Sequence, residues 1–401
     1  MKVLLADALP DAAVERLEAA GDEVIRMPDL DADTLPEHIA GFEVLIVRST
    51  KVTAAALDQA DSLGLIVRAG AGTNTIDCDR AAELGVFVCN VPGKNALAVA
   101  ELTMGLLIAI DRHIAAGTAD LRAGTWNKKA YSKAEGLFGR RMGIIGVGDI
   151  GIATAARASA FGIDVVAVTK PGRSDLAVAR AEAAGITFVD TLDELLATSD
   201  IVSLHVPGST DTKGMVDAAF LAKMKDGAVL LNTSRGDVVD EAALIDAMDN
   251  RSMRAGLDVY ANEPGSGTAE FDSTLAKHLS VVGTHHVGAS TNQAQAAVTD
   301  GTIDTVQAYR AGEPVNCVNL DPVPVRAATL TVRHHDRVGV LASVLQILRK
   351  EELNVSNMQN RVFAGSKAAV ASIDVGHLPS AEIVDEVQAL EDIIYISVTP
   401  A

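Results

Sequence analysis

Cysteine, aromatic side chains and positive charge are all scarce in this sequence. The 401 residues include three cysteines, 3% aromatic residues, and 34 basic against 53 acidic side chains, which gives a net charge of −19. Three scattered cysteines exclude a disulfide framework and a zinc site of the usual spacing, so we expect a reducing compartment and no metal. The acidic balance disfavours binding to nucleic acid or to an anionic membrane, and otherwise indicates solubility.

Long apolar runs are absent as well. No uninterrupted run reaches about 18 residues, the length needed to cross a bilayer. The first residues, MKVLLADALPDAA, become acidic at Asp7 and Asp11, before a secretory signal could form. We therefore expect a cytoplasmic protein. With 48% hydrophobic and 22% charged residues, the chain has enough apolar side chains for the cores of two or three domains.

Short apolar segments alternate with Ala-rich helical stretches. Continuous apolarity is typical of strands buried on both faces, and intervening helices are typical of parallel sheets. This pattern predicts doubly wound α/β domains. The predicted strands are residues 43–47, 65–67, 86–89, 142–145, 165–168, 201–205, 229–232 and 281–284.

Three further segments define the expected organisation. The residues PGKNALAVAELTMGLLIAIDRH after Val91 predict a long apolar helix, either in a core or running between two domains or subunits. Residues 319–326, with prolines at 322 and 324, predict a linker. Residues 327–401 then form a separate compact unit of strands and helices.

A glycine-rich turn predicts a dinucleotide site. Gly146, Gly148 and Gly151 have the spacing G-x-G-x-x-G between an apolar strand and an Ala-rich helix. Glycines here let the backbone turn tightly and approach a pyrophosphate, which the helix N-terminus stabilises. At the end of the next strand, Thr169 and then Lys170 stand where an acidic residue usually selects NAD over NADP. We expect NAD as cofactor, with NADP or dual use left open.

Three polar side chains follow predicted strands and together suit hydride transfer. Oxidation of a 2-hydroxy acid needs a base for the hydroxyl proton and a cation that holds the carboxylate and polarises the reacting carbonyl. His286 and Arg235 supply these two groups. Glu263 supplies a carboxylate that would orient the imidazole and raise its pKa. We expect these three residues to be catalytic.

These residues resemble the signatures of the D-isomer-specific 2-hydroxyacid dehydrogenase family. Arg235-Gly236, Glu263-Pro264 and the run His286 to Thr291 match the family's Arg-Gly, Glu-Pro and His-x-Gly-x-Ser-Thr motifs. His285 stands where the family usually has proline, and no role is assigned to it. The resemblance covers essentially the whole chain. It implies a flavodoxin-like substrate domain of residues 1–93 and 289–320, a Rossmann nucleotide domain of residues 94–288, and a C-terminal α+β ferredoxin-like ACT domain of residues 327–401.

The same resemblance implies the residues that contact the ligands. Asp258 is expected at the nicotinamide amide, and Arg48, Ser49, Asn95 and Gln295 at a substrate phosphate. The expected cofactor contacts are Gly146, Gly148, Asp149, Ile150, Gly151, Thr169, Lys170, His205, Val206, Pro207, Thr233, Ser234, Asp258, His286 and Gly288. The expected substrate contacts are Arg48, Ser49, Ala71, Gly72, Asn95, Arg235 and Gln295. Two alternatives stay open, namely that Arg48 is a surface residue and that His205 is a structural residue at a strand end.

The carboxy-terminal segments HHDRVGVLASV and LNVSNMQNRVF resemble an ACT domain. This resemblance favours D-3-phosphoglycerate as the substrate, because many of the enzymes that act on it carry such a domain. The product would be 3-phosphohydroxypyruvate, in the first step of serine biosynthesis. The resemblance places Asp336, Gly339 and Asn354 where an amino-acid effector such as serine would bind between paired domains of a dimer or tetramer. A module that only dimerises is the alternative. The rival functions are another D-2-hydroxyacid dehydrogenase or 2-ketoacid reductase, acting for example on 2-oxoglutarate, and a nucleotide-sensing protein similar to a co-repressor.

Overall fold

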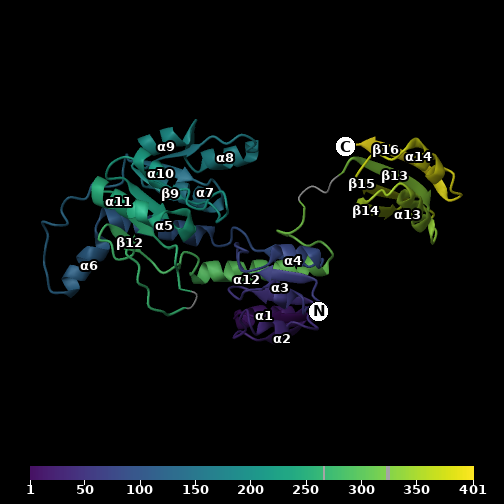
Figure 1. The fold of residues 1–401 in the computed structure, drawn as a ribbon, viewed down its shortest axis with the longest axis horizontal. Helices are drawn as coiled ribbons and strands as arrows, with labels where there is room; N and C mark the ends of the chain where they lie inside the picture. Colours follow the sequence, from purple (N-terminus) through teal and green to yellow (C-terminus); the bar gives the residue numbers. More distant parts are fainter. Residues whose placement is uncertain (265–266, 322–325) are drawn as a thin grey trace. The chain divides into compact units, whose positions relative to one another are not determined.

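The structure, a computed structural model, describes residues 1–264, 267–321 and 326–401. It divides the chain into two compact units, Met1–Asn319 and Leu320–Ala401 (Figure 1). The linker predicted at 319–326 lies partly outside the described residues, which omit 322–325. Within the described ranges, no helix combines the length and the hydropathy that crossing a membrane requires.

The first unit begins with a five-stranded parallel sheet whose order, β2-β1-β3-β4-β5, is that of flavodoxin. Helices α1 and α12 pack on one face of this sheet, and the short helices α2, α3 and α4 pack on the other. The sheet therefore combines both ends of the unit. Its elements are β1 (Lys2–Leu5), α1 (Asp11–Ala19), β2 (Glu23–Arg26), α2 (Leu35–His38), β3 (Val44–Val47), α3 (Ala54–Leu57), β4 (Leu65–Arg68), α4 (Cys78–Glu83), β5 (Phe87–Asn90) and α12 (Asn292–Arg310).

The second sheet of this unit has seven parallel strands in the order β12-β11-β10-β9-β6-β7-β8. The order reverses between β6 and β9, as in a Rossmann fold, and ligands bind at such a reversal. Helices α5, α7 and α8 cover one face, and α9, α10 and α11 cover the other. The strands are β6 (Arg141–Ile145), β7 (Asp164–Val168), β8 (Ile186–Val189), β9 (Ile201–Leu204), β10 (Val229–Asn232), β11 (Arg254–Leu257) and β12 (Val281–Gly283). The helices are α5 (Ala96–Asp111), α6 (Ile114–Arg122), α7 (Asp149–Ala160), α8 (Asp175–Ala183), α9 (Leu192–Thr198), α10 (Ala218–Lys223), the 3-10 turn η1 (Gly236–Val238) and α11 (Glu241–Arg251).

All eight predicted strands are confirmed, because each apolar run coincides with a strand of one of these two sheets. The long apolar helix is α5, which begins at Ala96 after a turn. Its second half packs in the core of the seven-stranded sheet through Met104, Leu107 and Ile110. Its first half reaches the cleft between the two sheets, where the buried Val99 lines the cavity. The second half of α5 is therefore a core helix, and the first half lies beside the cleft.

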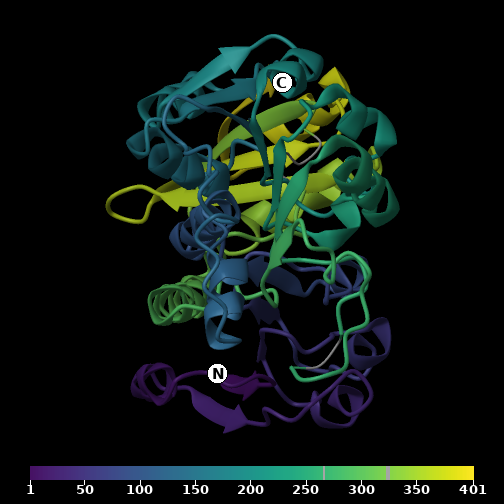
Figure 2. The same cartoon turned by 90° about the vertical axis from the view of Figure 1, so that its left-hand side faces the viewer.

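The second unit is a single antiparallel sheet in the order β14-β15-β13-β16, drawn in yellow and green in Figure 2. Strand β13 alternates buried and exposed side chains, so only one face is apolar. Helices α13 and α14 pack on that face through Val344, Leu348 and Val387. This βαββαβ arrangement confirms the predicted ferredoxin-like fold. Its elements are β13 (Ala328–His335), α13 (Val340–Lys350), β14 (Val355–Val362), β15 (Ala368–Val375), α14 (Ala381–Gln388) and β16 (Ile393–Pro400).

Candidate active site

His286 and Glu263 form a hydrogen-bonded pair. The Nδ1 atom of His286 lies 2.6 Å from Oε2 of Glu263. This contact raises the pKa of His286 above its usual value, against the opposing effect of burial. Burial alone would raise the pKa of Glu263, but hydrogen bonds from His286 and from the Tyr260 amide outweigh it and lower that pKa. A carboxylate that accepts from Nδ1 leaves Nε2 of the imidazole free to exchange a proton with a ligand.

The loop that carries His286 is held by Asp258, which is 1% exposed. Its carboxylate accepts hydrogen bonds from the backbone amides of Val287 (2.9 Å) and Gly288 (2.8 Å) and from the hydroxyl of Thr284 (2.5 Å). His286 itself has a positive φ of 54°, a left-handed conformation that is uncommon outside glycine. Asp258 lines the cleft as expected. It also stabilises the strained turn that determines the position of the His286 imidazole.

Arg235 faces the first sheet across the cleft. The cleft has a volume of about 480 Å³ and includes Ala71, Gly72 and Asn95 from the first-sheet side and Arg235 and His286 from the second. A Cβ at Gly72 would lie 2.7 Å from Nη2 of Arg235, so the backbone of the 71–72 loop comes close to this guanidinium. The arrangement places a cation and a small-residue loop on either side of one space, which suits a carboxylate.

A third arginine, Arg68, joins the two that were predicted. Arg68 is the last residue of β4 and lines both the cleft and an adjoining cavity of about 480 Å³ that also includes Arg48, Asn95 and Gln295. Burial, reinforced by Arg235 and Arg48, lowers its pKa. Its Nε atom is buried and makes no hydrogen bond. Three converging guanidinium groups form a strongly cationic site for an anionic ligand.

Ser49 lies apart from this site. Its hydroxyl donates to Oδ1 of Asp7 (2.5 Å), while the amides of Arg48, Ser49 and Thr50 donate to Oδ2 of the same carboxylate. These hydrogen bonds lower the pKa of Asp7 although burial opposes them. The backbone amides after β3 thus already have the Asp7 carboxylate as their hydrogen-bond acceptor. Of the residues expected at a phosphate, Arg48, Asn95 and Gln295 line the cavity, whereas Ser49 does not.

The glycine-rich turn between β6 and α7 fits a dinucleotide. Gly146 has φ of 100°, and a Cβ on it would lie 2.2 Å from the carbonyl oxygen of His205. A Cβ on Gly151 would lie 2.1 Å from the carbonyl oxygen of Gly146, so this glycine packs the helix on the strand. A Cβ on Gly148 would meet no protein atom within 4 Å, which leaves its backbone open to a pyrophosphate.

The remaining predicted cofactor contacts divide into two groups. One group lines the cleft: Ile150, His205, Val206, Pro207, Thr233, Ser234, Asp258, His286 and Gly288. The other lies outside it: Gly146, Gly148, Asp149 and Gly151 in the turn, and Thr169 and Lys170, both exposed, after β7. Asp149 forms an ion pair of 2.9 Å with Arg180. Arg173 stacks its guanidinium 4.8 Å from the centre of the Phe188 ring.

His205 has a structural as well as a cleft-lining position. Its Nε2 atom lies 2.9 Å from the Ser203 hydroxyl, and its Nδ1 atom is buried without a partner. Burial lowers the pKa of His205 to about 4, so the ring is neutral at physiological pH. A neutral ring adds no charge to the cofactor side of the cleft.

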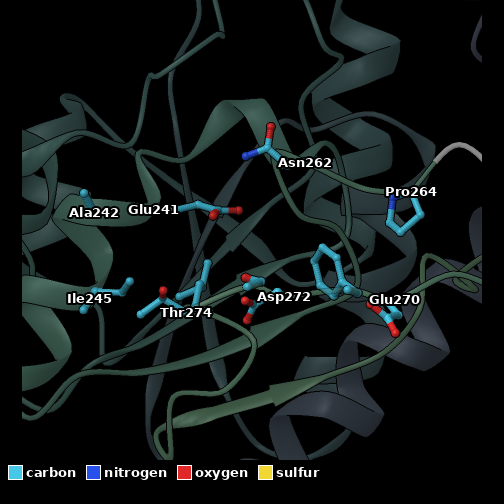
Figure 3. Close-up of a pocket in the computed structure, with 11 residues that line it drawn as sticks. Glu241, Ala242, Ile245, Asn262, Pro264, Glu270, Asp272 and Thr274 are labelled. Atoms are coloured by element: carbon cyan, nitrogen blue, oxygen red, sulfur yellow. The ribbon is translucent and has the colours of Figure 1, made fainter.

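A separate acidic pocket of about 540 Å³ lies between α11 and a wall formed by Asn262, Pro264 and residues 270–275 (Figure 3). Two of its carboxylates have partners, since Glu241 accepts from the Ala261 amide and Asp272 pairs with Lys277. None of the predicted catalytic residues lines this pocket. Across the described residues, no cluster of three or more His, Cys, Asp or Glu side chains could hold a metal ion.

Comparisons with known proteins agree with this geometry. Residues 104–288 match the model of the D-isomer specific 2-hydroxyacid dehydrogenase NAD binding domain, which confirms the prediction of NAD. The chain is similar to a hydroxypyruvate reductase from Thermotoga maritima, with 41% identity over 301 residues that cover 74% of this chain and 94% of that protein. It is also similar to a D-3-phosphoglycerate dehydrogenase from Methanocaldococcus jannaschii, with 37% identity over 327 residues.

That second match covers 81% of this chain and 60% of the archaeal protein, so the chain spans about three fifths of the length of that relative. A solved structure of a D-lactate dehydrogenase from Aquifex aeolicus, complexed with NAD and lactic acid, superposes with a TM-score of 0.67. Its sequence is 25% identical, and the alignment covers 80% of this chain and all of that one.

Proposed function

This chain belongs to the D-isomer-specific 2-hydroxyacid dehydrogenase family, and on that premise we propose that it oxidises D-3-phosphoglycerate to 3-phosphohydroxypyruvate. The observation that carries the proposal is the convergence of Arg48, Arg68 and Arg235 on two adjoining cavities that share His286. A substrate with a carboxylate and a phosphate would neutralise all three cations, whereas a simple 2-hydroxy acid would neutralise one of them.

The chain's own residues would perform the proton transfer. Nε2 of His286 takes the hydroxyl proton, while Glu263 keeps the Nδ1 proton in place and stabilises the imidazolium that forms. Arg235 and the 71–72 loop hold the carboxylate and polarise the carbonyl that develops. Gly146, Gly148 and Gly151 of the glycine-rich turn would hold NAD+, which would supply the hydride acceptor. The same groups would run the reverse reaction with the imidazole protonated at the start.

The phosphate would lie in the second cavity. Arg48 and Gln295 line that cavity, and Arg68 stands between it and the carboxylate side. Since guanidinium groups bind phosphate through paired N–H donors, this set suits a dianion better than one lysine would. Asn95 lines both cavities and would contact the part of the substrate between carboxylate and phosphate.

The direct test is the initial rate of cofactor reduction with D-3-phosphoglycerate, with NAD+ and NADP+ in parallel at pH about 9. We expect a clear rate with NAD+. The ratio of the two rates measures the selectivity for NAD+ over NADP+ of a site that has Thr169 and Lys170 in place of an acidic residue. D-glycerate serves as the control substrate that lacks the phosphate. Equal kcat/KM for the two hydroxy acids would overturn the phosphate assignment and leave the hydride-transfer mechanism standing.

A second candidate is a 2-ketoacid or hydroxypyruvate reductase. It is favoured by the match to the Thermotoga maritima reductase, which covers 94% of that protein. Oxidation of NADH by hydroxypyruvate or 2-oxoglutarate, undiminished in an Arg48→Met variant, would support this candidate. A protein that senses nucleotides without turnover is the remaining alternative, and steady-state activity with any of these substrates would exclude it.

We further propose that the second unit is an ACT domain that binds serine in a dimer or tetramer, which would place the enzyme at the first step of serine biosynthesis in the cytoplasm. Support comes from its ferredoxin-like topology and from the turn between β13 and α13, where Asp336 and Gly339 are exposed and Gly339 has φ of 91°. Asn354, directly before β14, is exposed too. If millimolar serine changed neither the melting temperature nor the rate, the domain would be a dimerisation module.

A further inference from the structure

A short segment of the chain covers one edge of the five-stranded sheet. Residues 316–319, here called the edge segment, run antiparallel to the outer strand β5. The amide of Asn90 donates to the carbonyl of Asn316 (3.2 Å), and the amide of Val318 donates to the carbonyl of Val88 (2.8 Å). The edge segment thereby pairs an edge that would otherwise expose unpaired backbone groups.

The side chain of Asn319 completes this pairing. Its Oδ1 atom accepts from the Val88 amide (2.9 Å), and its Nδ2 atom donates to the Val86 carbonyl (2.8 Å). The edge segment is followed directly by the second unit, which begins at Leu320. The edge segment is therefore the last part of the first unit, and its hydrogen bonds to β5 attach the chain there directly before the second unit begins.

Two cysteines face each other at the centre of this pairing. Cys89 and Cys317 are directly opposite, flanked on both sides by the two backbone hydrogen bonds, and their Sγ atoms are 2.9 Å apart. In an antiparallel pairing, opposed residues that do not hydrogen-bond to each other have Cα atoms about 4.5 Å apart. That separation falls within the roughly 4.4–6.8 Å that disulfides span. Cys89 is fully buried and Cys317 partly exposed.

We propose that Cys89 and Cys317 are a thiol–disulfide exchange site, at which oxidation covalently fixes the edge segment to β5. Cys317, the more exposed thiol, attacks a small disulfide such as oxidised glutathione and releases one glutathione. Cys89 then attacks the mixed disulfide, forms the Cys89–Cys317 bond and releases the second glutathione. Two protein thiols are oxidised, one glutathione disulfide is reduced to two thiols, and no other reactant is needed.

The chemical environment sets the pace of this exchange. Burial, together with the neighbouring Cys317, raises the pKa of the Cys89 thiol. Since the thiolate is the nucleophile, the second step is slow at neutral pH and faster in alkaline solution. The cross-link would also secure the end of β5, where the Asn90 side chain donates to the carbonyl of Ala71 (2.6 Å) in the substrate loop.

The third cysteine, Cys78 in α4, provides an internal control. The full-length protein is incubated with oxidised glutathione at pH about 8.5, then unfolded, and its free thiols are counted. We expect three thiols before oxidation and one afterwards, with Cys78 the free one and a cross-linked peptide containing Cys89 and Cys317 in the mass spectrum. Three free thiols, or glutathione adducts without the cross-linked peptide, would overturn the proposal and leave the pair as buried apolar side chains.

Hydrogen exchange tests the effect on the edge segment. The amides of Asn90 and Val318 form the backbone bonds on either side of the pair. Their exchange should slow on oxidation of the wild-type protein and of a Cys78→Ser variant. It should be unchanged by oxidation in Cys317→Ser, which cannot form the bond. If oxidation leaves these two amides unchanged in the wild-type protein, the cross-link does not fix the segment and that part of the proposal fails.

Discussion

Replacing Arg68 by methionine should weaken binding of the phosphorylated substrate without weakening the fold. The guanidinium of Arg68 lies between Arg48 and Arg235, and its own Nε atom has no partner in the protein. A hydrogen bond to a charged group contributes about 1.5–3 kcal/mol. Loss of one such bond to the substrate should therefore raise KM for D-3-phosphoglycerate about 10- to 150-fold.

The effect on stability should have the opposite sign. A lowered pKa means that the charged form of Arg68 is less favourable in the folded chain than in the unfolded one. Arginine stays charged below about pH 12, so this unfavourable contribution is present at every ordinary pH. Methionine of similar length removes the charge while keeping apolar contacts, and the free energy of unfolding should be unchanged or higher.

The assay compares KM for D-3-phosphoglycerate and for D-glycerate, together with urea unfolding of both proteins. Arg26→Met is the matched control, because Arg26 forms an exposed ion pair of 2.6 Å with Asp11 away from the cavities. Such exposed pairs contribute about 0–1 kcal/mol, and this variant should leave both KM values unchanged. An Arg68→Met protein that unfolds normally and keeps its KM for D-3-phosphoglycerate would refute the role of the arginine cluster.

Three further outcomes follow from the site. His286→Ala should lower kcat by roughly 10² to 10⁴, the contribution of general acid–base catalysis, while NADH still binds in a fluorescence titration. Glu263→Gln removes the contact that raises the pKa of His286, and oxidation needs the neutral imidazole. The rising limb of the rate profile for oxidation should therefore move to lower pH, and an unmoved limb would assign it to another group. Lys170→Ala should raise KM for NADP+ and leave KM for NAD+ unchanged, whereas no change in either would mean that Lys170 faces only solvent.

The fold could be predicted from the sequence where strands are buried on both faces. Strand β3 is apolar throughout and fully buried, so its pattern is distinct from that of a surface segment. Strands β1, β2, β8 and β11 were not predicted. Glu23 and Arg26 of β2 are exposed at a sheet edge, and β11 begins with Arg254 and contains a glycine. These charged residues and the glycine interrupt the apolar continuity on which the prediction depends.

The site was predictable as motifs, but Arg68 and Asp7 were not identified. An arginine at a strand end resembles a surface residue until the strand order is known, and here β3 and β4 are adjacent, so the residues that follow them meet. Asp7 follows β1, which pairs with β3, and its carboxylate binds the amides after β3 from more than 40 residues away in the sequence. Contacts of this range depend on sheet order, which the spacing of residues within one segment does not encode.

The arginine cluster has to act against the charge of the whole chain. With a net charge of −19, the protein repels a phosphorylated carboxylate at long range, whereas Arg48, Arg68 and Arg235 attract it within the cavities. Salt at about 0.1 M screens exposed charges beyond about 10 Å and affects buried contacts much less. The kcat/KM for D-3-phosphoglycerate should therefore rise between about 0.01 and 0.1 M salt, and rise less for D-glycerate, which carries fewer negative charges. A steady fall with salt would mean instead that exposed cations guide the substrate into the cleft.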